Sequence, residues 1–145
     1  MEVTVKGETT KIVIEVQERA YPDSNDYWDG NWLKTNLEIH IPGVHASFPT
    51  LLRNEDFSFF LKELKKINNQ LSGSAEFKTM ENAIHLRAEI SRSGKMKWRG
   101  KVIHPVGVCA TLTFVFENDQ SYLPPLLSEL EAVTKEFPVK GKPNH

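Results

Sequence analysis

The stretch Leu33–Gly73, LKTNLEIHIPGVHASFPTLLRNEDFSFFLKELKKINNQLSG, decides the fold class because its hydrophobic period changes once, near Asn54. Before that point, apolar and polar residues alternate over Leu33–Ile41 and Val44–Thr50, on either side of a Pro42-Gly43 turn. This is the pattern of a β-hairpin with one buried face. After it, apolar residues recur every three or four positions, which indicates an amphipathic helix that stops at the final glycine. Asn54 is expected to cap that helix.

The same two periods recur on both sides of this stretch. Alternation predicts further strands at Val3–Lys6, Lys11–Glu18, Ala75–Thr79, Ala83–Ile90, Lys95–Ile103 and Val106–Glu117. A second amphipathic helix is predicted over Pro124–Glu136, with its two prolines in the first turn. The predicted order is therefore β-β-β-β-α-β-β-β-β-α. It is typical of an α+β fold, a mostly antiparallel β-sheet with two amphipathic helices on one face. We expect a single domain over residues 1–138 and a mobile tail over 139–145.

A shift of 66 residues aligns parts of the two halves. It superimposes Trp32 on Trp98, Phe48 on Phe114 and Leu64 on Leu130. Two amphipathic helices also match partly by chance, so the sequence leaves open whether this similarity reflects an internal duplication.

Composition limits the classes of function. The chain has 145 residues and a formal net charge of -1, so no bulk charge favours nucleic acid or a membrane surface. A single cysteine, Cys109, cannot form an internal disulfide, which favours a reducing compartment, and we expect it to pack as a small apolar residue. The sequence shows neither a signal peptide nor an apolar run long enough to span a bilayer. We therefore expect a cytoplasmic protein with no membrane partner.

The segment Tyr21–Leu33, YPDSNDYWDGNWL, is the first candidate for a binding site. Aromatic residues give a large contact area at low entropic cost, and the aspartates would add a negative field. The candidate partner-binding residues are Asp23, Asp26, Tyr27, Trp28, Asp29, Asn31 and Trp32. Alternatively, the rings close one end of the core while the polar residues make turn hydrogen bonds. The sequence favours neither role over the other.

A second candidate surface is basic. It comprises side chains that project from two adjacent predicted strands: His85, Arg87, Lys95, Lys97, Arg99 and Lys101. Such a stripe could contact phosphates, which makes a nucleic-acid-binding module using the hairpin face 85–101 an alternative function. It could equally be a solvated outer face whose lysines discourage edge pairing. Trp98 is predicted to point inward with Met96 and Val102, so the face lacks the aromatic residues on which bases stack, which speaks against nucleic acid.

The sequence predicts no catalytic residues, no metal and no cofactor. It contains no nucleophile elbow, phosphate-binding loop or zinc-binding helix motif. His40 and His45 flank the hairpin turn and are interpreted as residues of the strand faces, not as a metal pair. The aspartate spacing does not fit a calcium-binding EF-hand loop. A small-ligand or sugar-binding protein, with the aromatic rings as a platform, remains a further alternative.

Several strings of this sequence are similar to one known family. DYWDGNWL (Asp26–Leu33) is followed by two alternating strands and a helix of the form F-x-x-F-L-x-E-L (Phe57–Leu64). LSGSAEF (Leu71–Phe77) and, after a strand that ends in FVFE, QSYLPPLLSEL (Gln120–Leu130) fit the same pattern. From about Ile12 to Pro138, the chain resembles the WapI-like immunity proteins of bacteria.

The resemblance implies a non-enzymatic function. Such proteins are encoded beside a secreted or contact-delivered polymorphic toxin, stay in the cytoplasm of the producing cell, and bind and neutralise the C-terminal domain of the cognate toxin. It implies no particular contact residues. On this hypothesis Tyr27, Trp28 and Trp32 would anchor the toxin, and the three aspartates would attract a basic one. The oligomeric state is left open.

Overall fold

The structure is a computed structural model that describes residues 1–105, 107 and 110–143. Its first half contains four strands and a helix: β1 (Glu2–Lys6), β2 (Lys11–Arg19), β3 (Trp32–Ile41), β4 (Val44–Arg53) and α1 (Asn54–Gln70). Its second half repeats that order with a short 3-10 helix added: β5 (Ser74–Lys78), β6 (Ile84–Ile90), β7 (Lys95–His104), β8 (Ala110–Asp119), η1 (Gln120–Tyr122) and α2 (Leu123–Glu136). The predicted α+β class and the predicted order of elements are confirmed.

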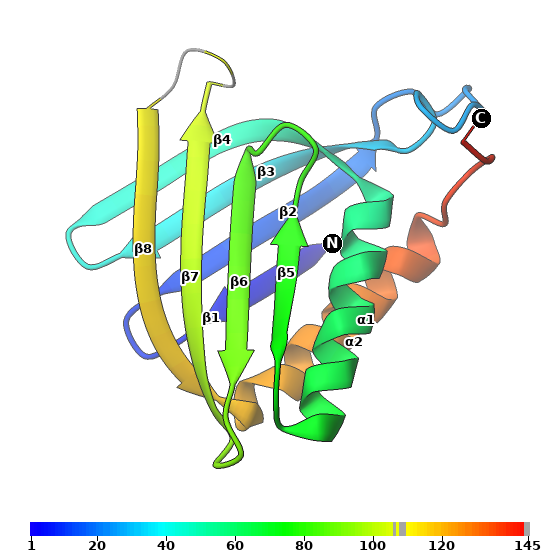
Figure 1. Ribbon diagram of the computed structural model, residues 1–145. Coiled ribbons are helices and arrows are strands. Elements are labelled where there is room, and N and C mark those ends of the chain that lie inside the picture. Colours follow the sequence, from blue (N-terminus) through cyan, green and yellow to red (C-terminus); the bar gives the residue numbers. More distant parts are fainter. Residues whose placement is uncertain (106, 108–109, 144–145) are drawn as a thin grey trace.

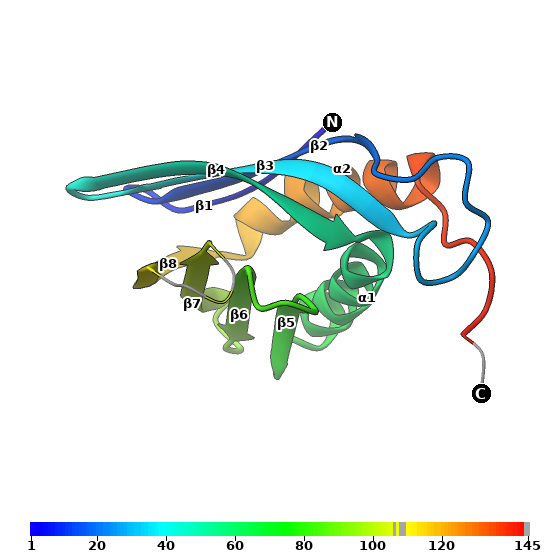
Figure 2. The ribbon, with the colours of Figure 1, turned by 90° about the horizontal axis from the view of Figure 1, so that it is seen from above.

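The strands are divided between two antiparallel sheets, β1-β2-β3-β4 and β5-β6-β7-β8, each in sequence order. The two sheets face each other with their strands crossing steeply (Figure 1). Seen from above, the helices lie side by side along one open side of this pair (Figure 2). There α1 packs against β5, α2 packs against β1, and the two helices pack against each other. Periodicity predicts which face of a strand is buried, but not which sheet the strand joins.

The core lies between the sheets and is closed by the helices. Buried apolar side chains from both sheets and both helices form one hydrophobic cluster. Trp98 is at its centre, because its ring stacks on Phe116 at 5.8 Å and meets Phe60 of α1 edge-on at 6.3 Å. Met96 and Val102 are buried beside it, as the alternation in this strand predicts.

The two halves correspond closely, but with two different shifts. β4 and α1 lie 66 residues before β8 and the segment η1–α2. β3 lies 63 residues before β7, because two residues connect β3 to β4 while five connect β7 to β8. Phe48 and Phe114 therefore occupy equivalent places, whereas the match of Trp32 with Trp98 is wrong. Trp32 begins β3, and Trp98 lies three residues inside β7.

The structure corrects two local predictions. The strand expected to end at Thr50 continues to Arg53, so Arg53 and not Asn54 is the N-cap of α1, and its side chain makes no capping bond. Asn54 is instead buried in the first turn of the helix. The strand expected from Val106 is described from Ala110 onward, and Cys109 lies outside the described residues.

Candidate functional site

Four parts of the chain meet where α1 begins. The loop of residues 20–31 connects β2 to β3, and Trp32 at the start of β3 pairs with Arg53 at the end of β4. The segment that follows α2 returns to the same place, so residues 138–140 lie beside the loop (Figure 1). We call residues 20–32 the acidic-aromatic loop.

Arg53 is the centre of this region. Only 1% of its surface is exposed, and its guanidinium carbon lies 5.1 Å from the ring centroids of both Tyr27 and Trp32, and 5.3 Å from that of Trp28. Cation–π attraction of this kind is stronger when the cation is removed from water. The guanidinium nitrogens also donate hydrogen bonds to the backbone carbonyls of Trp28 (2.7 Å) and Tyr27 (2.8 Å). The three rings are therefore positioned by one buried cation.

Glu55 neutralises this cation and also binds the loop. Its carboxylate accepts a hydrogen bond from Arg53 Nε and another from the Tyr27 hydroxyl. The hydrogen bond to Glu55 is the main reason why the pKa of Tyr27 is raised, because the phenol must keep its proton to donate that bond. Removing Glu55 would leave the buried Nε of Arg53 without its acceptor.

Two buried asparagines fix the base of the loop. Asn54 donates from Nδ2 to Asn31 Oδ1 at 3.1 Å, and its backbone N–H donates to the Asn31 carbonyl at 3.0 Å. Asn31 Nδ2 donates in turn to the Tyr27 carbonyl at 2.7 Å. Asn31 is one of the candidate partner-binding residues. It is fully buried, so its role is structural.

The C-terminal segment is bonded to the same loop. The Lys140 N–H donates to Asn31 Oδ1 at 2.8 Å, and its ammonium group donates to the carbonyls of Pro22 and Ser24, each at 3.1 Å. Arg19 joins the two segments, because its guanidinium donates to the carbonyls of Gly30 (2.7 Å) and Pro138 (2.6 Å). Residues 138–140 thus contact the loop, a connection that the sequence does not predict.

The outer side of the loop is accessible. Trp28 is 47% exposed, Tyr21 is half exposed, and Asp23, Asp26 and Asp29 are all exposed. Asp26 also has a local role, because its carboxylate accepts the N–H groups of Trp28 (3.0 Å) and Asp29 (3.2 Å). Tyr27 and Trp32 are half-buried against Arg53. The loop therefore combines both of the roles considered for it, a structural inner side and an exposed outer side.

Sequence reasoning missed the groups that hold the loop. Arg53 and Glu55 lie more than 20 residues from the rings in sequence, and nothing in the alternation of β4 separates Arg53 from an ordinary solvated arginine. The register of the β3–β4 hairpin is the signal that could have identified Arg53. Once β3 and β4 are aligned across the Pro42-Gly43 turn, Arg53 falls opposite Trp32.

The basic face is partly neutralised. His85 and Arg87 of β6 both pair with Glu76 on β5, at 2.7 and 3.1 Å, and Arg87 also pairs with Glu89 at 3.3 Å. The hydrogen bond from His85 is the main cause of a lowered pKa at Glu76. Lys95, Lys97, Arg99 and Lys101 are exposed on β7. Acidic side chains therefore neutralise the β5–β6 part of this face, whereas its β7 part carries four basic side chains in a row.

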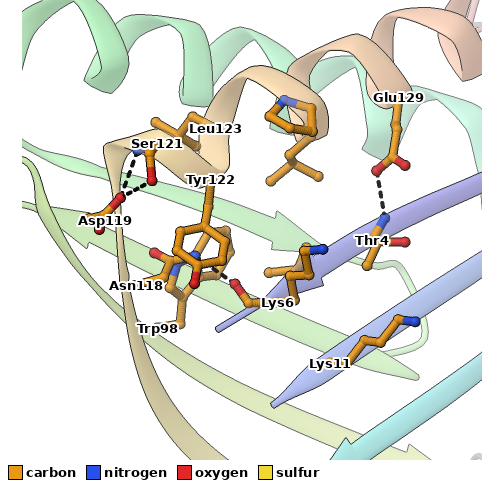
Figure 3. Close-up of a pocket in the computed structure, with 13 residues that line it drawn as sticks. Thr4, Lys6, Lys11, Trp98, Asn118, Asp119, Ser121, Tyr122, Leu123 and Glu129 are labelled. Carbon is orange, nitrogen blue, oxygen red and sulfur yellow. Dashed lines mark hydrogen bonds between the residues drawn. The ribbon is translucent and has the colours of Figure 1, made fainter. Parts of the chain in front are cut away.

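A hollow of about 530 Å³ lies between β1, the end of β8 and the start of α2 (Figure 3). Several polar groups on its wall already have protein partners. Asn118 accepts from Trp98 Nε1 and donates to the Lys6 carbonyl, both at 2.9 Å, and Glu129 accepts the Thr4 N–H at 2.9 Å. The hydroxyl and N–H of Ser121 both donate to Asp119, which lowers the pKa of that carboxyl. The bonds from Asn118 to Lys6 and from Thr4 to Glu129 join the two halves, which is a structural role.

Other candidate chemistry is limited to surface contacts. His40 and His45 face each other across the β3–β4 hairpin with stacked rings 4.1 Å apart. In residues 1–105, 107 and 110–143, no three His, Cys, Asp or Glu side chains gather as a metal site would require. No helix in this part of the chain is long and apolar enough to cross a membrane.

The comparisons with known proteins give one match. Searches of curated proteins and of solved structures find nothing that matches this chain. The family model described as the immunity protein WapI-like family matches residues 4–138. This range includes all of both sheets except the first two residues of β1, both helices and the whole acidic-aromatic loop, and it agrees with the resemblance seen in the sequence. The chain belongs to the immunity protein WapI-like family.

Proposed function

We propose that this protein binds the C-terminal domain of a cognate bacterial toxin and neutralises it by occlusion, without catalysis, in the cytoplasm of the cell that makes the toxin. The observation that carries the proposal is the family match over residues 4–138, which supports a role in toxin immunity. Members of such a family are generally non-enzymatic. Contact-dependent delivery of a polymorphic toxin is part of the same proposal.

The outer side of the acidic-aromatic loop is the proposed contact surface. Trp28 offers an exposed indole on a base that Arg53 holds in place, so little side-chain entropy would be lost on binding. Aromatic residues of this kind supply much of the energy of protein interfaces when they enter a pocket on the partner. Tyr27, whose ring meets that of Trp28 edge-on at 5.0 Å, would support it.

The charge of the loop favours a basic toxin surface. Asp23, Asp26 and Asp29 are all exposed around Trp28. Carboxylates at the rim of an interface mainly accelerate association, and salt screens this effect. We therefore expect the association rate to fall with ionic strength while the dissociation rate changes little.

Growth protection tests this proposal. The C-terminal domain of the toxin encoded beside this gene is expressed from one promoter and this chain from another in the same cells. We expect cells that make the wild-type chain to grow and cells that lack it to stop growing. Trp28→Ala should protect less well than Phe59→Ala, a matched aromatic control on the exposed side of α1. If the wild-type chain is well expressed and cells still die, the proposal is wrong.

A further inference from the structure

The two sheets have four edge strands, which differ in how they are protected from pairing with a further strand. The β5 edge is covered by α1 and the β1 edge by α2. β4 carries Pro49, which has no N–H and is typical of edge strands. β8 ends its sheet and, among the described residues, is paired only with β7. Its residues Ala110–Phe116 include neither a charge nor a proline, so they lack the usual protection against edge pairing.

The β3–β4 hairpin extends over this open edge. Both views show its tip reaching past β8 on the side away from the helices (Figures 1 and 2). The position of β7 beneath β4 is fixed by Phe48, whose ring stacks on that of His104 at 4.4 Å. Beyond that contact, Ala46 and Val44 continue the inward face of β4, and Val44 is 44% exposed. This apolar overhang would be covered by one more strand beside β8.

The other end of the edge is acidic. A hollow of about 420 Å³ lies along the second half of β8, between that strand and the β1–β2 turn. Its wall includes three carboxylates, from Glu8, Glu117 and Asp119, and one ammonium group, from Lys95. Hydrogen bonds from Ser121 hold the pKa of Asp119 below its ordinary value. The hollow therefore complements a basic side chain.

We propose that the free edge of β8 binds an extended segment of the toxin domain as a fifth strand of the second sheet. This inference takes the identity of the partner from the proposed function, but it uses a surface remote from the acidic-aromatic loop. The main chain of the segment would pair with Ala110–Phe116. Apolar side chains at alternate positions would lie under Val44 and Ala46, and a lysine or arginine would enter the acidic hollow.

A second copy of this chain fits the edge less well. Two β8 strands that pair antiparallel are related by a two-fold axis perpendicular to the sheet. That axis would bring the β3–β4 hairpin of the second copy to the same side of the sheet, where the first hairpin already extends. Two hairpins would then share that side of the sheet, which favours a segment of another protein over a second copy.

Amide hydrogen exchange tests the inference directly. The full chain is labelled with ¹⁵N, and exchange is followed alone and with the C-terminal domain of the toxin encoded beside this gene. Successive N–H groups of β8 point alternately toward β7 and away from it. The outward half of the amides in residues 110–116 should exchange about 100-fold more slowly in the complex. A complex that protects only the acidic-aromatic loop would overturn the β8 inference and leave the proposed function intact, whereas absence of a complex would overturn both.

A pair of proline variants tests pairing at β8 by binding affinity, without hydrogen exchange. Leu112→Pro and Thr113→Pro place proline at neighbouring positions of β8. One of these positions donates its N–H to β7, and the N–H of the other points toward the free edge. The variant that keeps the melting temperature of the wild type should bind the toxin domain at least about tenfold more weakly, because it has lost a pairing donor. Phe59→Ala is the control and should change the affinity less than about fivefold, since this exposed side chain lies on α1, away from the β8 edge. Undiminished binding by the folded proline variant would contradict pairing at β8.

Discussion

The guanidinium of Arg53 covers one face of the Trp28 ring at 5.3 Å, while nearly half of the Trp28 surface is exposed to solvent. One residue is thus completely buried and the other is accessible, although they are in contact. The buried cation keeps the exposed indole in one orientation, which is the property required of an anchor at an interface. The first predictions concern these two residues.

Replacing Arg53 should destabilise the protein strongly. Arg53→Ala would remove the guanidinium donor from the Trp28 carbonyl, and one of two donors from the Tyr27 carbonyl and from the Glu55 carboxylate. We expect the free energy of unfolding to fall by about 3–5 kcal/mol, measured by urea denaturation. Arg53→Lys should recover only part of this loss, because an ammonium group cannot form the planar fork. Arg99→Ala on the exposed face of β7 is the control and should change stability by no more than about 0.5 kcal/mol.

Trp28→Ala should separate binding from stability. The exposed half of the ring contributes little to the fold, so we expect a loss of about 1 kcal/mol or less in the free energy of unfolding. Binding of the toxin domain should weaken by about 2 kcal/mol or more, which is roughly a 30-fold rise in Kd. Equal losses in both measurements would indicate that Trp28 acts only within the fold.

Asp56 should make stability depend on pH in an unusual direction. Burial, followed by the nearby Glu55 charge, raises the pKa of Asp56 to about 7, and its Oδ2 has no hydrogen-bond partner among the described residues. The folded state therefore holds a proton that the unfolded state loses near pH 4, so this group's contribution to stability is complete below that pH and falls as the pH rises through 7.

Asp56→Asn removes this titration. The variant should gain about 1–2 kcal/mol relative to the wild type between pH 5 and pH 8, a range that allows for the water that still reaches the carboxyl group. Urea denaturation at both pH values gives the comparison. A constant difference between the two proteins would show that Asp56 is ionised throughout this range.

Gly100→Ala should disturb the second sheet. Gly100 pairs with Phe114, and a Cβ at Gly100 would overlap the Phe114 ring. The cost should be about 1–3 kcal/mol, as is usual when a tightly packed core is overfilled. The double variant Gly100→Ala/Phe114→Leu should recover part of the loss, since the smaller side chain makes room. A stable single variant would indicate that the ring can move aside.

The expected mobility of residues 139–145 stays a prediction, but the contacts of Lys140 make it more specific. Its N–H is bonded to the buried Asn31, so this amide should exchange slowly, whereas those of Gly141 and Lys142 should exchange rapidly. Amide exchange by NMR distinguishes the three. Removing residues 140–145 should also accelerate exchange in the acidic-aromatic loop, because the bonds from Lys140 to Pro22 and Ser24 would be lost.

The elements of the fold follow from local patterns, and their assembly does not. Alternation predicts the buried faces of Leu37 and Trp98, and helical spacing predicts those of Phe60 and Leu130. These patterns report only that one face of an element is buried. The separation of the strands into two sheets depends on contacts between residues far apart in sequence, such as Phe60 with Trp98.

The sequence predicts only part of the candidate site, because local patterns do not report contacts between residues far apart in the chain. The acidic-aromatic loop is distinctive in composition, and its exposed Trp28 and aspartates lie together as the sequence suggests. The partners that hold it, above all Arg53 and Lys140, come from other elements and have no local signature. The free edge of β8 was also missed, because an edge is defined by the absence of a neighbouring strand, which only the sheet order reveals.

Titration calorimetry of the purified chain with the C-terminal domain of the toxin encoded beside its gene tests the central claim most directly. Neutralisation by occlusion predicts a one-to-one complex with a Kd of about 10 nM or tighter, and a weaker complex for Trp28→Ala. The absence of heat of binding for two folded, active preparations would contradict it.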